Sequence, residues 1–313
     1  MQSTGTLVGP LKGEPQHVYP HPRQEPLKLT VDTPGLFILC GTLLVAINFL
    51  SPRIVTSFVT IFPFAVYLQK DYSNFISLGP GGTPSTFWGY LRILYLRLFA
   101  LRHPYQPPKG EHSGHPVLRT LPSSQASPHR QDGILAECDL PYRLGPRPQV
   151  AGIAPQRQLD QPGDQACYSA LRRSLEHFAE TRHENFAIAV SCFEKNGLAL
   201  FAKRPIHKTC GGEICHIHDS DRSLHLTLTA EDITEILEKG WGQRHPLARD
   251  QAWPPMPVPK GFVMVYAPRD MEELGIVLRI IEAAVWYCAQ EKVKVERVGL
   301  EPEQLTWHGP NNA

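Results

Sequence analysis

The sequence predicts an α+β fold, in which helices pack on one face of a mainly antiparallel sheet and an N-terminal transmembrane helix precedes the sheet. Three observations support this prediction. Short runs that alternate apolar and polar residues follow one another through residues 186–229, with turn residues between them. Helix-start signals followed by apolar stripes lie beside and after these runs. A long apolar segment with a single charge lies near the N-terminus.

The apolar segment reads "GLFILCGTLLVAINFLSPRIVTSFVTIFPFAVYL" from Gly35 to Leu68, and Arg53 is its single charge. Its first part, from Pro34 to about Arg53, would form a helix of roughly 28 Å, close to the bilayer's hydrocarbon thickness of about 30 Å. Prolines interrupt the second part, which is a kinked continuation, a second short span or an interfacial segment. We assign residues 34–68 to a transmembrane or hydrophobic segment, with a buried core helix as the alternative.

The regions around this segment differ in composition. Residues 1–32 are rich in Pro, His and Gln, which predicts a disordered tail. Residues 71–102 include "TFWGYLRILYLRLFALR", whose arginines recur at every fifth position. This pattern predicts a membrane-proximal helix that lies at a lipid surface or packs against the first helix. Residues 103–130 predict a Pro-rich linker, and residues 134–300 the folded domain.

Basic residues lie mostly after the apolar segment. The positive-inside rule therefore predicts a single-pass membrane protein with its C-terminal domain in the cytosol.

The folded domain contains recognisable elements in the order α-β-β-β-β-α-β-α. An amphipathic helix begins near Asp164, and Asn196-Gly197 predicts a tight hairpin turn between the next two strands. The runs "EICHIH" and "SLHLTLT" pair about the turn "DSDR", which places His216 opposite His225. Capping boxes that start at Thr229 and Asp270 predict two helices, and residues 261–267 predict the strand between them.

Composition excludes some classes of partner. The chain has 313 residues and a formal net charge of +1, so its overall electrostatics do not favour nucleic acid. The seven cysteines are odd in number and scattered, and no C-x-x-C occurs. We therefore predict no disulfide framework and a reducing compartment.

Four histidines gather in "HIHDSDRSLHLTL" and "GWGQRHPLA". Strand alternation puts His216, His218 and His225 on one sheet face, and His245 arrives from the loop after the following helix. These three strand histidines could bind a metal with one position open. In a metal-free alternative, a neutral histidine removes a proton from an acidic enol or phenol, and Arg244 with Gln243 holds the developing oxyanion. A purely structural polar cluster is the third possibility.

Several motifs together resemble one family. These are "HIHDSDRSLHLTL", "LEKGWGQRHPLA", "VYAPR" before an acidic helix start, "DLPYRLGPRP", "QRQLDQ" and "DYSNFISLGPGGTPSTFWGY". They are similar to the luciferases of luminous mushrooms and to the wider group of fungal proteins with the same luciferase-like domain. The resemblance covers roughly residues 71–290, and "GWGQRHPL" is its most specific block.

The resemblance implies a membrane-attached protein and, in the luminous members, oxygenation of the pyrone 3-hydroxyhispidin by O2 without a known cofactor. By analogy we expect a small aromatic or pyrone substrate and a lipid membrane as partners, with O2 as co-substrate and no other cofactor. His218, His225 or His245 would be the catalytic base. Arg244 and Gln243 would clamp the oxyanion, while Trp241 and His216 would contribute to substrate binding.

This chain departs from the family in its longer Pro-rich tail, its longer hydrophobic run and its inserted 103–130 linker. A membrane-bound O2-dependent monooxygenase and a luciferase-like fold without this activity are therefore both kept as hypotheses. In the alternative, the domain is a non-catalytic or metal-binding module at a membrane surface, and His216, His218 and His225 are the metal ligands.

Overall fold

The computed structural model describes residues 33–49, 52–108, 133–138, 140–207, 209–250 and 254–299. The predicted tail of residues 1–32 lies outside the described residues, as does most of the predicted linker. The helices are α1 (Thr33–Phe49), α2 (Pro52–Ser77), α3 (Phe87–Arg97), α4 (Gln165–Thr181), α5 (Ala230–Glu238) and α6 (Met271–Ala289), with short 3-10 turns η3 (Leu135–Cys138) and η4 (Cys210–Gly212). The strands are β1 (Val150–Gly152), β2 (Gln156–Gln158), β3 (Phe186–Val190), β4 (Leu198–Ala202), β5 (Glu213–Ile217), β6 (Leu224–Thr227), β7 (Gly242–Arg244) and β8 (Phe262–Val265).

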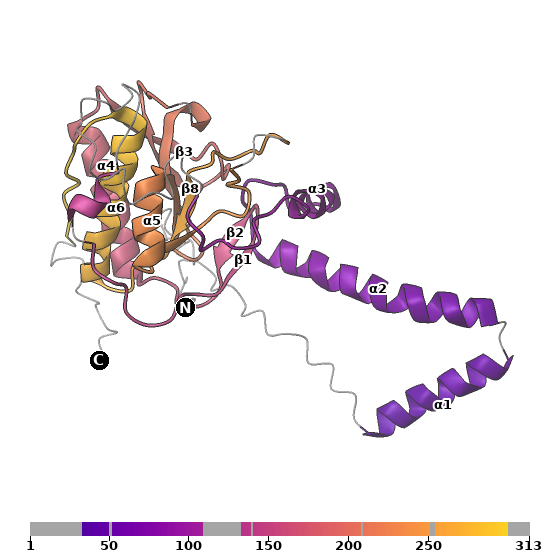
Figure 1. The fold of residues 1–313 in the computed structure, drawn as a ribbon. Coiled ribbons are helices and arrows are strands. Elements are labelled where there is room, and N and C mark those ends of the chain that lie inside the picture. Colours follow the sequence, from indigo (N-terminus) through magenta and orange to yellow (C-terminus); the bar gives the residue numbers. More distant parts are fainter. Residues whose placement is uncertain are drawn as a thin grey trace, which may run out of the picture.

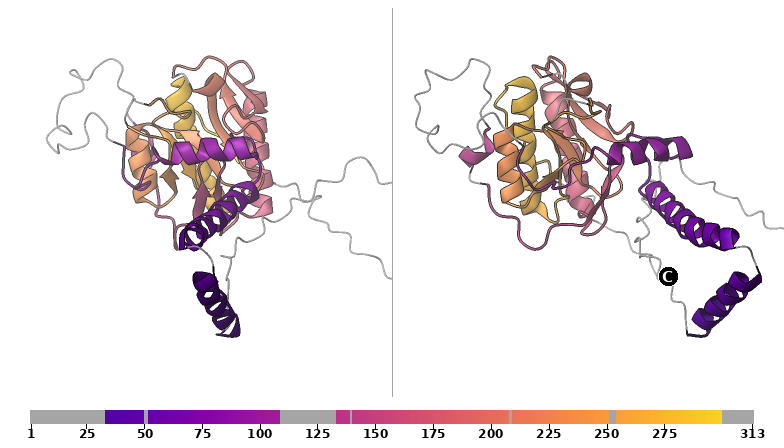
Figure 2. Two further views of the ribbon diagram at one scale, coloured as in Figure 1. Left: turned by 90° about the vertical axis from the view of Figure 1, so that its right-hand side faces the viewer. Right: turned by 45° about the vertical axis from the view of Figure 1, so that its right-hand side comes forward.

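A six-stranded antiparallel sheet forms the centre of the domain, in the order β3-β4-β5-β6-β8-β7. In Figure 1, α4, α5 and α6 lie together on one side of this sheet, while β1, β2 and α3 lie on the other. The two further views agree with this arrangement (Figure 2). The predicted α+β fold, with a mainly antiparallel sheet and packed helices, is therefore confirmed.

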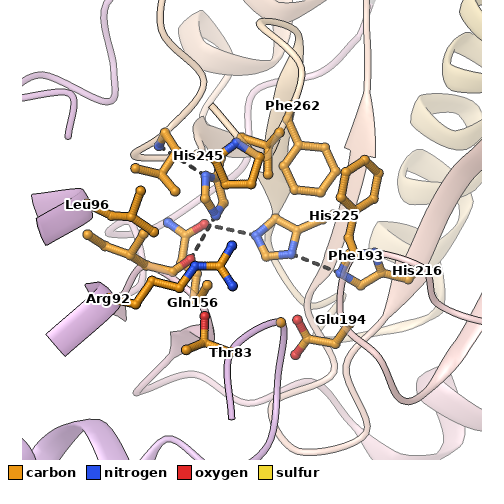
Figure 3. A pocket seen from close by; sticks show the side chains of 16 residues that line it. Thr83, Arg92, Leu96, Gln156, Phe193, Glu194, His216, His225, His245 and Phe262 are labelled. Carbon is orange, nitrogen blue, oxygen red and sulfur yellow. Dashed lines mark hydrogen bonds between the residues drawn. The ribbon is translucent and has the colours of Figure 1, made fainter. Parts of the chain in front are cut away.

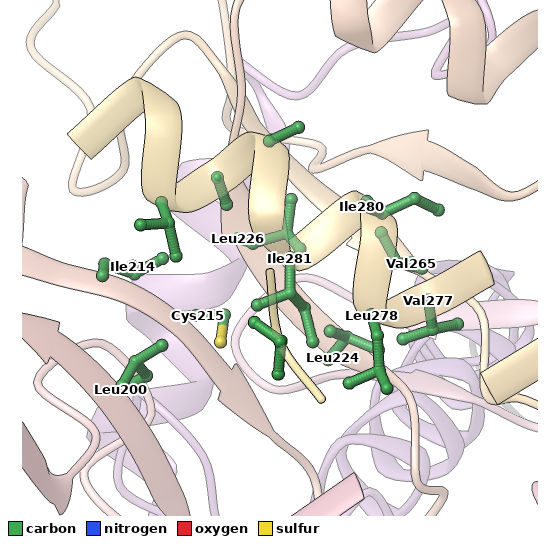
Figure 4. Packing of buried hydrophobic residues seen from close by; sticks show 14 of the residues in the cluster. Leu200, Ile214, Cys215, Leu224, Leu226, Val265, Val277, Leu278, Ile280 and Ile281 are labelled. Carbon is green, nitrogen blue, oxygen red and sulfur yellow. The ribbon is translucent and has the colours of Figure 1, made fainter. Parts of the chain in front are cut away.

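The main core lies between the sheet and α6. Side chains from one face of β5, β6 and β8 pack on a stripe of α6 that is buried throughout (Figure 4). The residues labelled there are Leu200, Ile214, Cys215, Leu224, Leu226, Val265, Val277, Leu278, Ile280 and Ile281. Because strand side chains alternate between faces, filling this face with apolar groups leaves the histidines of β5 and β6 on the opposite face.

The predicted pairing of the histidine strands is confirmed, because His216 pairs with His225 across β5 and β6. The predicted caps are also present. Thr229 accepts from the backbone N–H of Asp232 at the start of α5, and Asp270 accepts from two backbone N–H groups at the start of α6. These local signals fixed the helix starts because they satisfy donors that the helix itself leaves unpaired.

Two local predictions were wrong. The β3–β4 hairpin exists, but residues 191–197 form a wider connection in place of the tight turn at Asn196-Gly197. The carboxylate of Glu213 accepts hydrogen bonds from Ser191, Cys192 and Phe193, which pulls this segment out of the strand pairing. Residues 242–244, predicted as loop, form β7 because their backbone pairs with the edge of β8.

The cysteine prediction was also wrong, because Cys192 and Cys210 form a disulfide with their Cα atoms 5.9 Å apart. Cys192 reaches η4 through the turn that Glu213 holds. Sequence spacing gave no sign of this pairing, since the two residues meet only through the fold. Cys215 is a buried member of the main core.

The N-terminal apolar segment forms two helices, α1 and α2, and a separate second helix was one of the arrangements considered for its second part. The described residues include no helix that is both long enough and apolar enough to cross a bilayer, so the predicted transmembrane helix is not found among them. The predicted 71–102 helix is divided as well, since residues 71–77 belong to α2 and α3 begins at Phe87.

A second, smaller core joins α2 and α3 to the domain. Phe75, Tyr90, Ile93 and Leu96 pack there with Ile153 and Leu247. The carboxylate of Asp71 also accepts hydrogen bonds from Tyr90 and Arg97, and so links α2 to α3. Helix α3 is therefore held against the histidine side of the sheet.

Candidate functional site

A small cavity lies between the histidine face of the sheet and the segments that cover it (Figure 3). Its volume is about 60 Å³, which is room for a few water molecules. The sheet and its loops contribute Phe193, Glu194, His216, His225, His245, Leu247 and Phe262. The covering segments contribute Gly82, Thr83, Arg92, Leu96, Ile153, Ala154, Gln156, Pro257 and Val258.

His216 is oriented by a carboxylate on its own strand. Its Nδ1 lies 2.6 Å from Oε1 of Glu213, and both side chains are almost completely buried. Both oxygens of this carboxyl group also accept hydrogen bonds from Ser191, Cys192 and Phe193, so the group faces His216 as an acceptor. His216 therefore carries its proton on Nδ1 and turns Nε2 toward the other histidines.

His218 has an equivalent partner in the turn that follows. Its Nδ1 lies 3.2 Å from Oδ1 of Asp221 and 2.9 Å from Oγ of Ser223, which itself donates to Asp221. Asp221 was assigned to an ordinary turn in the sequence analysis, but its side chain is buried and holds the imidazole. His218 does not line the cavity and lies behind the two histidines that do.

His225 lies at the centre of the cluster (Figure 3). Its Nδ1 is 3.2 Å from Nε2 of His216 and 3.0 Å from Nε2 of His218. Its Nε2 is 2.9 Å from Oε1 of Gln156, and its ring stacks on Phe262 at 5.1 Å between centroids. The ring is thus fixed by contacts on both edges and on one face.

His245 has both ring nitrogens engaged by the backbone. Nε2 donates to the carbonyl oxygen of Ile153 at 2.8 Å, and Nδ1 accepts from the N–H of Leu247 at 3.1 Å. These partners require a neutral ring. Burial, as the largest cause, lowers the pKa of His245 from 6.5 to about 4.

Burial also lowers the pKa values of His218 and His225 well below 6.5, with further lowering from neighbouring charged groups. Both imidazoles are therefore neutral near pH 7. Each ring nitrogen of His218, His225 and His245 lies within 3.2 Å of a polar atom of the protein. The three predicted bases thus lie close together, but none turns a free nitrogen into the cavity.

The structure places the other predicted site residues away from the cavity. Trp241 packs in the main core, and its indole N–H donates to the carbonyl oxygen of Pro141. Gln243 accepts from the hydroxyl of Tyr266, and Arg244 pairs with Asp250 at 3.0 Å. The oxyanion clamp and the tryptophan wall expected from the "GWGQRH" block are therefore not part of this cavity, because Gln243 and Arg244 bond to other residues from β7 and Trp241 packs in the main core.

Gln156 of β2 and Glu194 line the cavity, and sequence reasoning missed both. Arg157 follows Gln156 on β2, does not line the cavity, and forms a buried ion pair with Glu194. Burial raises the pKa of Glu194, although Arg157 opposes this effect. The motif "QRQ" could have suggested this role, since three consecutive polar residues buried on a short strand require partners inside the protein.

The histidines could also hold a metal ion. One ring nitrogen from each of His216, His218 and His225 lies within 4.8 Å of the other two, and all three residues are buried. Within the described residues, this is the group of side chains whose spacing suits a metal ion.

The cavity brings imidazole, carboxyl and amide groups together on an antiparallel α+β domain, an arrangement typical of small-ligand and catalytic sites. The family model of the luciferase domain matches residues 211–284. The luciferases of Armillaria ostoyae and Armillaria mellea are each 33% identical over 241 residues, which cover 72% of this chain and 83% of each relative. The luciferase of Neonothopanus nambi is 32% identical over 240 residues, with 72% of this chain and 82% of the relative covered. The chain belongs to this fungal luciferase family. No solved structure matches it.

Proposed function

We propose that this protein is an O2-dependent monooxygenase of a small hydroxylated aromatic or pyrone substrate, attached to a membrane. The observation that carries the proposal is the cavity itself, in a chain related to luciferases over most of its length. Its lining combines a buried carboxylate, an amide and apolar walls, which suits an aromatic ring with acidic hydroxyl groups.

Glu194 is the base in this proposal. It lines the cavity, and its raised pKa makes it a stronger proton acceptor than an exposed carboxylate. Glu194 takes the proton of the substrate hydroxyl, and the electron-rich ring carbon then forms a bond to O2. Oxygen accepts two electrons in this step, and the proton returned by Glu194 completes a hydroperoxide. Arg157 remains beside the carboxylate and balances its charge.

Substrate entry requires the cover to move. Ligand pockets usually measure roughly 300–1,000 Å³, whereas this cavity has about 60 Å³. Arg92 and Leu96 of α3 and the loop at Pro257 and Val258 form its outer side. Displacing α3 or this loop is the way to enlarge the cavity without disturbing the sheet.

Membrane attachment is the second part of the proposal. Large apolar side chains are exposed along α1 and α2, which extend away from the domain in Figure 1. They include Phe37, Ile38, Leu39, Phe49, Ile54, Phe58, Ile61, Phe62 and Phe64. Exposed apolar surface of this extent marks an interaction site, and a lipid surface suits its lack of charged partners. The C-terminal domain would then lie on the cytosolic side, following the positive-inside rule.

Oxygen uptake by membranes that contain the full chain tests the activity, with 3-hydroxyhispidin and a panel of hydroxypyrones and phenols as substrates and with light counted in parallel. We expect Glu194→Gln to lower uptake by about 100-fold or more. The matched control is Glu180→Gln, since Glu180 is exposed on α4. His225→Ala and His245→Ala test the contribution of the histidines. Folded wild-type protein that neither consumes O2 nor binds any compound of the panel would contradict the proposal.

Membrane attachment is tested separately by co-sedimentation of the full chain with phospholipid vesicles. Phe58→Glu with Phe62→Glu places two charges on stacked exposed rings, so we expect most of the protein to leave the vesicle pellet. Protease protection in sealed microsomes reports on which side the domain lies. Equal sedimentation of this variant and wild type would rule out α2 as the lipid contact.

A further inference from the structure

The groups around the histidine cluster determine which nitrogen of each ring carries its proton. The outer nitrogens of the three rings face the oxygen acceptors Glu213, Asp221 with Ser223, and Gln156. A neutral imidazole carries a single N–H, and an oxygen acceptor requires it on the outer nitrogen. The inner nitrogens, Nε2 of His216, Nε2 of His218 and Nδ1 of His225, therefore each present a lone pair.

The three inner nitrogens all lie within 4.8 Å of one another. Nδ1 of His225 lies 3.2 and 3.0 Å from Nε2 of His216 and His218. Lone pairs at such distances repel one another unless a positive group lies between them. Tetrahedral zinc with nitrogen ligands at about 2.0–2.1 Å implies nitrogen–nitrogen separations of about 3.3 Å. Two of the three separations are thus close to those of a tetrahedral metal site.

The groups around the cluster are mostly oxygen acceptors. Glu194, Glu213 and Asp221 are three buried carboxyl groups, and the Arg157 guanidinium is paired with Glu194. Glu213 and Asp221 lie directly behind His216 and His218, as carboxyl groups do behind histidine ligands of a metal ion.

An unpaired donor marks the side on which a further ligand would lie. Nε2 of Gln156 is buried and has no hydrogen-bond partner among the described residues, although the side chain lines the cavity. His216 and His225 line the same cavity, while His218 lies behind them. An oxygen ligand in the cavity could therefore complete the coordination and accept from Gln156.

We propose that His216, His218 and His225 bind one divalent first-row transition-metal ion, with the fourth coordination position open to the cavity. Glu213 and Asp221 are positioning residues, because they orient the rings of His216 and His218 as carboxylates behind histidine ligands do. Imidazole ligands suit zinc, iron, nickel and copper, whereas magnesium and calcium prefer oxygen. The inference stands on this geometry and does not depend on the proposed oxygenation.

Two metal-free arrangements compete with this proposal. In one, His225 carries its proton on Nδ1 and shares it between Nε2 of His216 and Nε2 of His218. Nε2 of His225 is then an acceptor, so the amide of Gln156 must be flipped to present its N–H group. In the other, His216 and His218 are both protonated, with ring centroids 5.3 Å apart inside the protein. Neither arrangement binds a metal ion, so metal binding distinguishes both from the proposal.

The test uses the full chain, purified without a histidine tag or chelator. Metal content is measured by mass spectrometry, and protein stripped with dipicolinate is titrated with Zn²⁺ and with Co²⁺. We expect one tight equivalent and the visible Co²⁺ absorption of a four-coordinate site. His218→Gln should weaken this site by about 100-fold or more, and Asp221→Asn by about 10–100-fold. The chain has 14 histidines, so exposed His177→Gln and cavity-lining His245→Gln serve as controls that should keep the site.

X-ray absorption at the zinc edge of wild-type protein provides a measurement without any variant, in case His218→Gln does not fold. A first shell with three imidazole nitrogens supports the proposal. Folded wild type without a tight equivalent would overturn it, as would a tight site that survives His218→Gln unchanged. Oxygen uptake is not a readout here, so failure of the metal site and failure of the proposed oxygenase can be told apart.

Discussion

At the scale of single residues, Glu213 connects two parts of the site. One oxygen of its carboxylate accepts from His216 and Ser191, and the other accepts from the backbone of Cys192 and Phe193. The same side chain therefore orients an imidazole and folds the turn that carries Glu194 to the cavity.

Glu213→Gln should destabilise the domain by roughly 2–4 kcal/mol, because an amide cannot accept from all four donors and leaves buried groups unpaired. Urea denaturation of the variant and wild type measures this difference in the free energy of unfolding. Glu180→Gln on the exposed surface of α4 should change it by less than about 0.5 kcal/mol. A similar small change at Glu213 would show that the turn is held by other contacts.

The pKa of His245 predicts a dependence of stability on pH. Because its folded-state pKa of about 4 lies below the ordinary 6.5, the unfolded chain binds a proton in this range that the native state does not. Stability is therefore full above pH 6.5 and falls as the pH drops toward 4.

For metal-free protein, His245 alone should account for a loss of roughly 2 kcal/mol between pH 7.5 and 5. Urea denaturation at several pH values gives the slope, which should be smaller for His245→Gln and unchanged for His177→Gln. Equal slopes in all three proteins would contradict a neutral, buried His245.

The sequence predicted the site only in part. Period-two alternation was sufficient to bring His216 opposite His225, because strand geometry fixes it. Glu194 and Arg157 could not be found in this way, since they meet across 37 positions of the chain through a turn held by a third residue. Trp241 was misassigned because local composition does not reveal that a side chain just before β7 turns into the main core.

At the scale of elements, capping signals were reliable because they act within a few residues. Asp270 accepts from the N–H groups of Glu272 at 2.9 Å and Glu273 at 2.8 Å, where α6 starts. Strand β7 was missed for the opposite reason, since its three residues form a strand only by pairing with β8. Helix α6 carries most of the core that supports the histidine strands.

Asp270→Ala should lower the free energy of unfolding by about 1 kcal/mol, because two backbone donors of α6 lose their acceptor. Asp270→Asn keeps an acceptor and should recover most of this loss. Thermal or urea denaturation of the pair tests the cap directly. Equal stability of the alanine and asparagine variants would mean that the side chain contributes little.

At the scale of the whole molecule, metal binding would add to the stability of the domain. Zinc at about 100 times its dissociation constant adds roughly 2.7 kcal/mol when it binds only the native state. For a domain of this size that raises the melting temperature by roughly 5–10 °C. Scanning calorimetry of stripped protein with Zn²⁺ should show this rise, whereas Mg²⁺ should not. A rise of equal size in His218→Gln would place the stabilising ion elsewhere.

The cavity is assembled from several separate stretches of the chain. Its histidine floor lies within residues 211–284, the part matched by the family model, while Thr83, Arg92, Leu96 and Gln156 come from earlier segments. A protein shortened to residues 134–300 would keep the histidine floor but lose the lining residues Thr83, Arg92 and Leu96. By the same reasoning, two proteins with identical floors could enclose different shapes, so the choice of substrate could diverge while the chemistry at the floor remained the same.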